Sequence, residues 1–201
     1  MVHWLFWLIA ILFGVAVTYV PHGWPGVFVW TIVIFVSVLA HEMGHTVTAW
    51  LFNKQPGIVI HSFGGFTYFS GKDLPRWQHF LIVASGPLCS IGLIGCFVIL
   101  LPLIELSPLI SWAIIYGVGI NFFLTVVNCF PIMPLDGGLM LRDLLGYDNE
   151  PALRRVGGGF AVFLLVICLL FNQLVLAVLM GLLAYLNFKG SMNLQGGVIK
   201  Q

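Results

Sequence analysis

Long apolar runs dominate the chain, and polar residues cluster in the short segments between them. A helix needs roughly 20 predominantly apolar residues to cross a bilayer. Six runs are candidates for this role, at about 2–20, 27–52, 80–101, 109–129, 158–171 and 174–188. The pattern therefore predicts an all-α polytopic membrane protein with six transmembrane helices.

The segment 58–69, between the second and third predicted helices, follows a different pattern. Two short runs of β-branched and aromatic residues surround Gly64 and Gly65, which predicts a β-hairpin. The segment is too apolar for an ordinary cytoplasmic loop, and non-helical backbone at membrane depth is tolerated where protein covers it. We therefore expect a membrane-dipping hairpin, and an interfacial loop without a special role is the alternative.

Composition favours a single integral-membrane domain over residues 1–201. The chain is 60% hydrophobic and 7% charged, whereas a soluble domain carries about 25% charged residues. With so few basic residues, a nucleic-acid surface is not expected. The four cysteines lie in apolar runs without a C-x-x-C pair, so we expect small core residues rather than disulfides or thiolate ligands.

The charges predict how the helices are oriented. With six crossings, the two termini and the segments 53–79 and 130–157 share one side of the membrane. All eight basic residues fall on that side: Lys54, Lys72, Arg76, Arg142, Arg154, Arg155, Lys189 and Lys200. The loops on the other side carry Glu105 as their single charge. By the positive-inside rule, both termini are cytoplasmic.

The most unusual polar cluster is HEMGH, residues 41–45, inside the second apolar run. Residues four apart share a helix face, so His41 and His45 can reach one metal ion, and Glu42 can act as the base for a water molecule there. Ionisable groups at membrane depth are expensive unless they pair or bind something. The cluster predicts a metal-dependent hydrolase. His41 lies about 21 Å into a ~30 Å apolar core, counted from Val27, which places the site in the cytoplasmic half.

A catalytic zinc ion takes three protein ligands and water, so the two histidines leave one ligand to be found. Asp136 lies in NCFPIMPLDGG, residues 128–138, directly after the fourth run. Two prolines break the helix there and two glycines let the backbone turn, so we expect Asp136 to be the third ligand. The alternative is an Asp that caps a helix over 137–145. His61 and His79 are expected to be satisfied or interfacial.

At these two motifs the chain resembles the site-2 protease family of intramembrane zinc metalloproteases, which carries HExxH on one span and a later N-x-x-P-x-x-P-L-D-G-like motif. The third predicted helix opens with SGPL, residues 85–88, like the family's small-residue-Gly-Pro segment. Many relatives carry Asn shortly afterwards, whereas this chain has Cys89-Ser90, to which we assign no catalytic role. The expected catalytic core is about 27–145, followed by helices five and six at about 158–188. The layout resembles the compact, sporulation-type branch without a PDZ or CBS domain.

The resemblance implies a role for each motif residue. His41, His45 and Asp136 would bind one Zn²⁺ per chain. Glu42 would be the general base and then the proton donor. Asn128 matches the family residue that helps to bind substrate or to stabilise the oxyanion; a helix-end Asn that satisfies the broken backbone is the alternative.

The implied activity is hydrolysis of peptide bonds within or near transmembrane segments. The substrate would be a membrane-anchored protein, such as a transcriptional regulator or its precursor, in the cell membrane of a prokaryote, with no nucleic-acid partner. The hairpin around Gly64 and Gly65 would offer a strand edge to an extended substrate. The alternatives are a CAAX-type peptidase and, in another class, a catalytically inactive metal-binding scaffold or a transporter. A transporter would spread polar residues over several spans.

Overall fold

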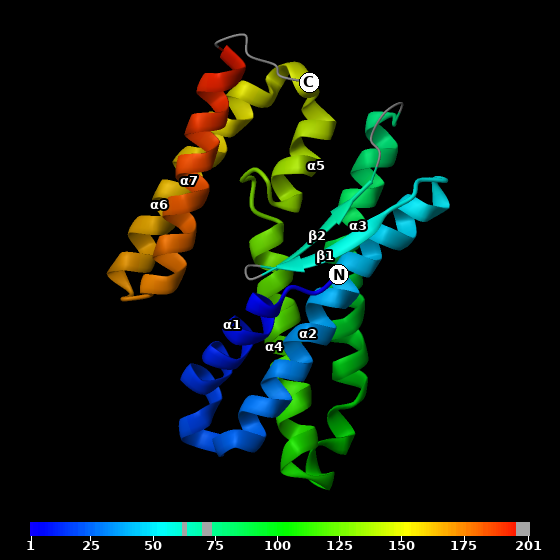
Figure 1. Cartoon of the computed structure of the whole chain (residues 1–201), viewed down its shortest axis with the longest axis vertical. Helices are drawn as coiled ribbons and strands as arrows, with labels where there is room; N and C mark the ends of the chain where they lie inside the picture. Colours follow the sequence, from blue (N-terminus) through cyan, green and yellow to red (C-terminus); the bar gives the residue numbers. More distant parts are fainter. Residues whose placement is uncertain (62–63, 70–73, 196–201) are drawn as a thin grey trace. The chain divides into compact units, whose positions relative to one another are not determined.

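The computed structural model describes residues 1–61, 64–69 and 74–195. Figure 1 follows its helices along the chain: α1 (Trp4–Gly14), α2 (Val20–Leu51), α3 (Arg76–Ile99), α4 (Pro108–Asn128), α5 (Asp136–Leu145), α6 (Glu150–Leu170) and α7 (Leu174–Gln195). A π-helical turn, Val15–Tyr19, joins α1 to α2, and short 3-10 helices cover Leu101–Leu106 and Tyr147–Asn149. The chain forms two compact units: a first unit of residues 1–73 and 84–126, and a second unit of residues 74–83 and 127–201.

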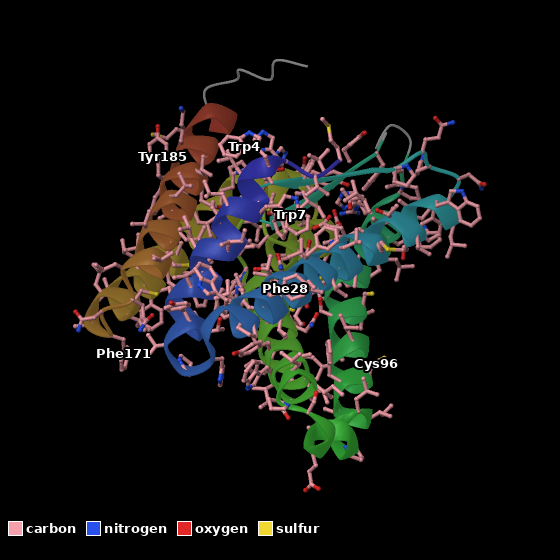
Figure 2. All side chains as sticks on the ribbon, turned by 60° about the horizontal axis from the view of Figure 1, so that its bottom comes forward. Trp4, Trp7, Phe28, Cys96, Phe171 and Tyr185 are labelled. Carbon is pink, nitrogen blue, oxygen red and sulfur yellow. The ribbon has the colours of Figure 1, made fainter. Side chains whose placement is uncertain are left out.

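The prediction of a mostly helical membrane protein is confirmed. Within the described ranges, five helical stretches are long and apolar enough to cross a membrane: Trp4–Leu51, Arg76–Ile99, Pro108–Asn128, Tyr147–Leu170 and Leu174–Met192. Large apolar side chains such as Trp4, Phe28 and Phe171, which Figure 2 labels, are exposed. Lipid, rather than water, suits such a surface.

The first of these stretches contains the first two predicted helices. It is 48 residues long, which at ~1.5 Å per residue is more than twice the ~30 Å thickness of the apolar core. Residues 21–26, expected as a loop, are helical except at Gly23, where φ is 63° and ψ is −161°. The chain reverses there, and α1 packs back along α2. Two contacts show this packing: the Phe6 and Phe35 rings are 6.0 Å apart, and Gly14 lies against Val27.

The predicted hairpin is present as β1 (Gly57–His61) and β2 (Gly64–Tyr68), which pair antiparallel. Gly64 and Gly65, expected between the two runs, instead lie inside β2, opposite His61 and Ile60. The connection at 62–63 lies outside the described residues. The other edge of β1 is covered by the start of the chain, since Val2 bridges Ile60 in parallel.

In the second unit, α6 begins at Glu150, eight residues before the predicted start at 158. Two features favour the earlier start. Pro151 occupies the first turn of the helix, and the Glu150 carboxylate lies 2.7 Å from the Arg154 guanidinium group. Gly157 and Gly158, which lie at the predicted start, are packing positions within α6. A Cβ on Gly157 would lie 2.7 Å from the Pro131 carbonyl oxygen.

The helices α6 and α7 form the core of the second unit. The chain turns between them at Asn172, whose φ is 55°. The turn lies where the sequence predicts a break, between the runs 158–171 and 174–188. Their buried core consists of Ile132, Ala161, Met180, Leu183 and Ala184. Ile132 belongs to the irregular segment between α4 and α5, so the helix pair supports that segment.

Candidate metal and catalytic centre

His41, Glu42 and His45 lie on one buried face of α2, as the i, i+4 spacing predicts. The Nε2 atoms of the two imidazoles face each other at a distance of 3.3 Å. In the described part of the chain, the ligand atoms of these three residues lie within 4.8 Å of one another. Two imidazole nitrogens and a carboxylate, buried together, form a donor set that suits Zn²⁺.

The His41 ring is oriented by a residue to which the sequence assigned no role. Its Nδ1 lies 3.0 Å from Oγ of Ser90 on α3, and Ser90 is fully buried. Donation from Nδ1–H to Ser90 leaves the Nε2 lone pair free to bind a metal. The available signal was a small polar residue within an apolar helix.

Close packing of α3 against α2 explains the small-residue-Gly-Pro segment. A Cβ on Gly86 would overlap with Nε2 of His45 and would lie 2.9 Å from Nε2 of His41. On the other helix, a Cβ on Gly44 would overlap with the Ser85 carbonyl oxygen. Both glycines therefore let the helix backbones approach at the level of the imidazoles.

The helix α4 also meets this face of α2. Ser37, one turn before His41, accepts a hydrogen bond of 2.8 Å from Nδ2 of Asn121 on α4, and both residues are fully buried. A second bond from the same nitrogen reaches the Gly117 carbonyl oxygen at 2.8 Å. The buried hydroxyl of Ser37 is thus bonded by a neighbouring helix, which helps to fix the face of α2 that carries the two histidines.

The Glu42 side chain lies against the hairpin. Thr67 of β2 donates a hydrogen bond of 2.7 Å from Oγ1 to Oε2 of Glu42. Gly65, two residues earlier on the strand, has no room for a side chain, because a Cβ there would overlap with the Glu42 carboxyl group. The sequence predicted the hairpin but missed the contact between Thr67 and Glu42.

Asp136 is buried and is the first residue of α5. Leu135 occupies the N-cap position and makes no side-chain capping bond. Asp136 is therefore not the N-cap residue of α5. Asn128, the other predicted site residue of this segment, is the last residue of α4. Both belong to the second unit, whereas the two histidines belong to the first, and Asp136 as their partner stays a prediction.

The irregular segment before Asp136 is held by Asn187 of α7, which sequence reasoning missed. Asn187 is fully buried. Its Nδ2 donates to the Met133 carbonyl oxygen at 2.6 Å, and its Oδ1 accepts from the Met133 N–H at 3.3 Å. A Cβ on Gly137 would overlap with the Cys129 carbonyl oxygen. The N–H and carbonyl groups of Met133 are therefore satisfied within the protein.

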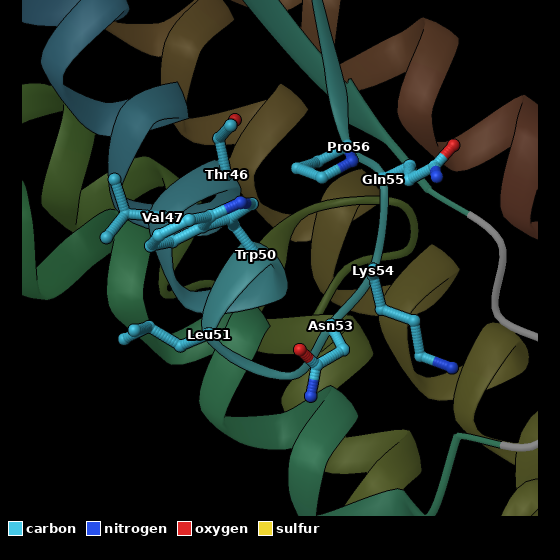
Figure 3. A pocket seen from close by; sticks show the side chains of 8 residues that line it. All are labelled: Thr46, Val47, Trp50, Leu51, Asn53, Lys54, Gln55 and Pro56. Carbon is cyan, nitrogen blue, oxygen red and sulfur yellow. The ribbon is translucent and has the colours of Figure 1, made fainter.

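A cavity of about 770 Å³ opens in the first unit where α2 ends (Figure 3). Its lining combines apolar residues of α2, such as Trp50, with polar residues of the following segment, such as Lys54. Thr46, which also lines it, donates a bond of 2.8 Å to the Glu42 carbonyl oxygen. The cavity therefore begins one helical turn from the base.

The other four histidines lie outside the HEMGH segment. His79 lies 2.6 Å from the buried carboxylate of Asp143. The His3 side chain caps the start of α1, and His22 stacks on Trp112 with ring centroids 4.2 Å apart. His61 is exposed at the end of β1.

Comparison with known proteins gives related sequences. Residues 7–199 match the family model described as Peptidase M50B-like. A Synechocystis sp. protein provisionally named a zinc metalloprotease is 34% identical over 137 residues, which is 64% of this chain and 36% of that protein. A zinc metalloprotease of Methanocaldococcus jannaschii is 28% identical over 161 residues, 77% of this chain and 46% of that protein. The chain spans less than half the length of these two relatives.

A solved structure shares the fold. The site-2 protease from Methanocaldococcus jannaschii superposes with a TM-score of 0.55 and 23% sequence identity, over 96% of this chain and 88% of that chain.

Proposed function

Because this chain belongs to the Peptidase M50B-like family, we propose that it is a membrane-embedded zinc endopeptidase. Its substrates are membrane-anchored proteins, such as regulators or their precursors, which it cuts within or near transmembrane segments. The observation that carries this proposal is the buried group of His41, Glu42 and His45, whose ligand atoms lie within 4.8 Å of one another. A metal ion makes such a group tolerable at membrane depth.

In this proposal His41, His45 and Asp136 hold one zinc ion. The orientation of His41 by Ser90 supports it, and so does the buried position of Asp136 in a segment whose backbone Asn187 satisfies. When bound, zinc supplies Lewis acidity, which would lower the pKa of water toward neutrality and polarise a carbonyl group. Both histidines act as neutral ligands and Asp136 as a carboxylate.

Glu42 carries the proton. Its carboxylate accepts a proton from the attacking water and delivers it to the leaving amine. Water arrives from the cytoplasmic side, through the cavity that starts at Thr46 and includes Lys54 (Figure 3). Asn128 assists by binding the substrate or stabilising the oxyanion.

The substrate segment must be extended before attack, because the amides of a helix are bonded within it. The hairpin supports a mode of binding in which the segment pairs with β2, Gly64 and Gly65 included, as an added strand. The start of the chain already covers the far edge of β1. In the described residues, β2 therefore forms the outer strand of this small sheet.

We also propose that residues 1–201 form one membrane domain with six crossings and both termini in the cytoplasm. The return of α1 along α2, seen in the Phe6–Phe35 contact, supports two crossings within Trp4–Leu51. With four further stretches, the basic residues then share one side.

Co-expression with candidate single-span regulators tests the proposed function. Wild-type protein should produce a shortened substrate, and Glu42→Gln should not, although it accumulates in the membrane equally. Equal product from both proteins would exclude Glu42 as the base. Stoichiometric zinc in a wild-type protein that cuts no substrate would favour a metal-binding scaffold or transporter.

A further inference from the structure

The Glu42 carboxylate is held by a hydroxyl group from the hairpin. Oγ1 of Thr67 lies 2.7 Å from Oε2 of Glu42 and 3.2 Å from its carbonyl oxygen. A hydroxyl group has one proton to donate, and the shorter contact is the one to the carboxylate. The Glu42 carbonyl oxygen has its own donor, Thr46, at 2.8 Å. Thr67 is therefore free to bond to the carboxylate.

The alternation of β2 brings Thr67 to this position. Successive side chains of a strand point to opposite faces. Phe66 and Tyr68 are exposed on one face, whereas Gly65 and Thr67 share the face that meets Glu42. Because Gly65 has no side chain, the strand approaches α2 closely enough for the Thr67 hydroxyl to reach Oε2.

We propose that Thr67 is a positioning residue for the catalytic base. Its hydroxyl fixes the Glu42 carboxylate through Oε2 and leaves Oε1 to take the proton from water. This inference rests on the proposed function and adds a link to it: the strand that receives the substrate also orients the base. A substrate that pairs with β2 thereby stabilises the strand that holds Glu42 in its working orientation.

The effect on turnover follows from the kind of bond. Hydrogen bonds to charged groups are roughly twice as strong as neutral ones, and losing one typically costs about 10- to 100-fold in an equilibrium or rate. Removing the hydroxyl should therefore lower kcat by about 10- to 100-fold. Because neither zinc nor the substrate touches this hydroxyl in the proposal, zinc content and KM should change little.

The test compares full-length variants in detergent or in vesicles, with a substrate that the wild-type protein cuts. Thr67→Val keeps the shape and removes the donor, so kcat should fall while zinc content and KM stay within about twofold. Thr67→Ser keeps the donor and should retain most of kcat. Thr31→Val is the matched control, because the Thr31 hydroxyl donates to the Val27 carbonyl oxygen on the same helix, at 2.8 Å; its kcat should match wild type.

Three results would overturn the inference. One is a wild-type kcat in Thr67→Val, and another is a raised KM with unchanged kcat, which would make Thr67 a substrate contact. The third is an equal loss in Thr67→Ser. If Thr67→Val does not accumulate, Thr67→Ala, which also lacks the donor, provides the same comparison. An inactive wild-type protein would instead reject the proposed function, and this inference with it.

Discussion

The His41 imidazole uses its two nitrogens for different purposes. Nδ1 contacts Ser90 at 3.0 Å, and Nε2 faces Nε2 of His45 at 3.3 Å. Partners of this kind fix the tautomer and the ring orientation of a metal ligand, and their loss typically costs 10- to 100-fold in metal affinity. Ser90 therefore matters to the site although it does not itself bind the metal.

Ser90→Ala should weaken zinc binding by about 10- to 100-fold. Competition with a chelator of known affinity, on purified protein, measures this change. Ser111→Ala is the control, because the Ser111 hydroxyl in the first turn of α4 donates to the carbonyl oxygen of Ser107, the residue before that helix. Equal zinc affinity in the two variants would show that Ser90 does not orient His41.

At the scale of elements, the segment between α4 and α5 depends on a helix far away in the sequence. Asn187 of α7 bonds to both the N–H and the carbonyl oxygen of Met133, and its Nδ2 also reaches the Leu183 carbonyl oxygen at 2.7 Å. Asp136 follows Met133 by three residues. The helix α7 thus holds the segment in which Asp136 lies, through Asn187.

Asn187→Leu should destabilise the protein, since each buried polar group left unpaired costs about 1–3 kcal/mol. Thermal unfolding in detergent should show a lower midpoint, and cleavage should fall with it. Asn149→Ala is the comparison, because Asn149 is exposed and its side-chain amide donates to the Leu145 carbonyl oxygen. Equal midpoints for the two variants would refute the supporting role of Asn187.

Local patterns predicted some elements and missed others for physical reasons. The HEMGH helix and the hairpin follow from spacing and hydropathy within a few residues. The contacts Ser90–His41, Thr67–Glu42 and Asn187–Met133 join residues 25 to 54 positions apart, and no local pattern encodes them. The start of α6 was placed wrongly because glycines that allow close packing resemble glycines that end a helix.

For the whole molecule, the main expectation is its orientation. The stretch Trp4–Leu51 turns at Gly23 and packs on itself, so it supports two crossings rather than one. With six crossings, we expect the segment around Gln55 to lie in the cytoplasm and Glu105 to lie outside. The distribution of all eight basic residues depends on this count.

Cysteine labelling in a variant without the four native cysteines measures the orientation. A reagent that does not cross membranes should label Glu105→Cys in intact cells, and Gln55→Cys only after permeabilisation. Both positions are exposed in the structure. The reverse pattern of labelling would contradict cytoplasmic termini.

The most direct test of the account measures zinc content and cleavage on the same purified preparations. Wild-type protein should contain stoichiometric zinc and cut its substrate, and a chelator should abolish cleavage until zinc is restored. Glu42→Gln should keep the zinc without cleavage, whereas Asp136→Ala should lose both. Full zinc retention in Asp136→Ala would remove Asp136 from the metal site, and cleavage by zinc-free protein would contradict the proposed zinc endopeptidase.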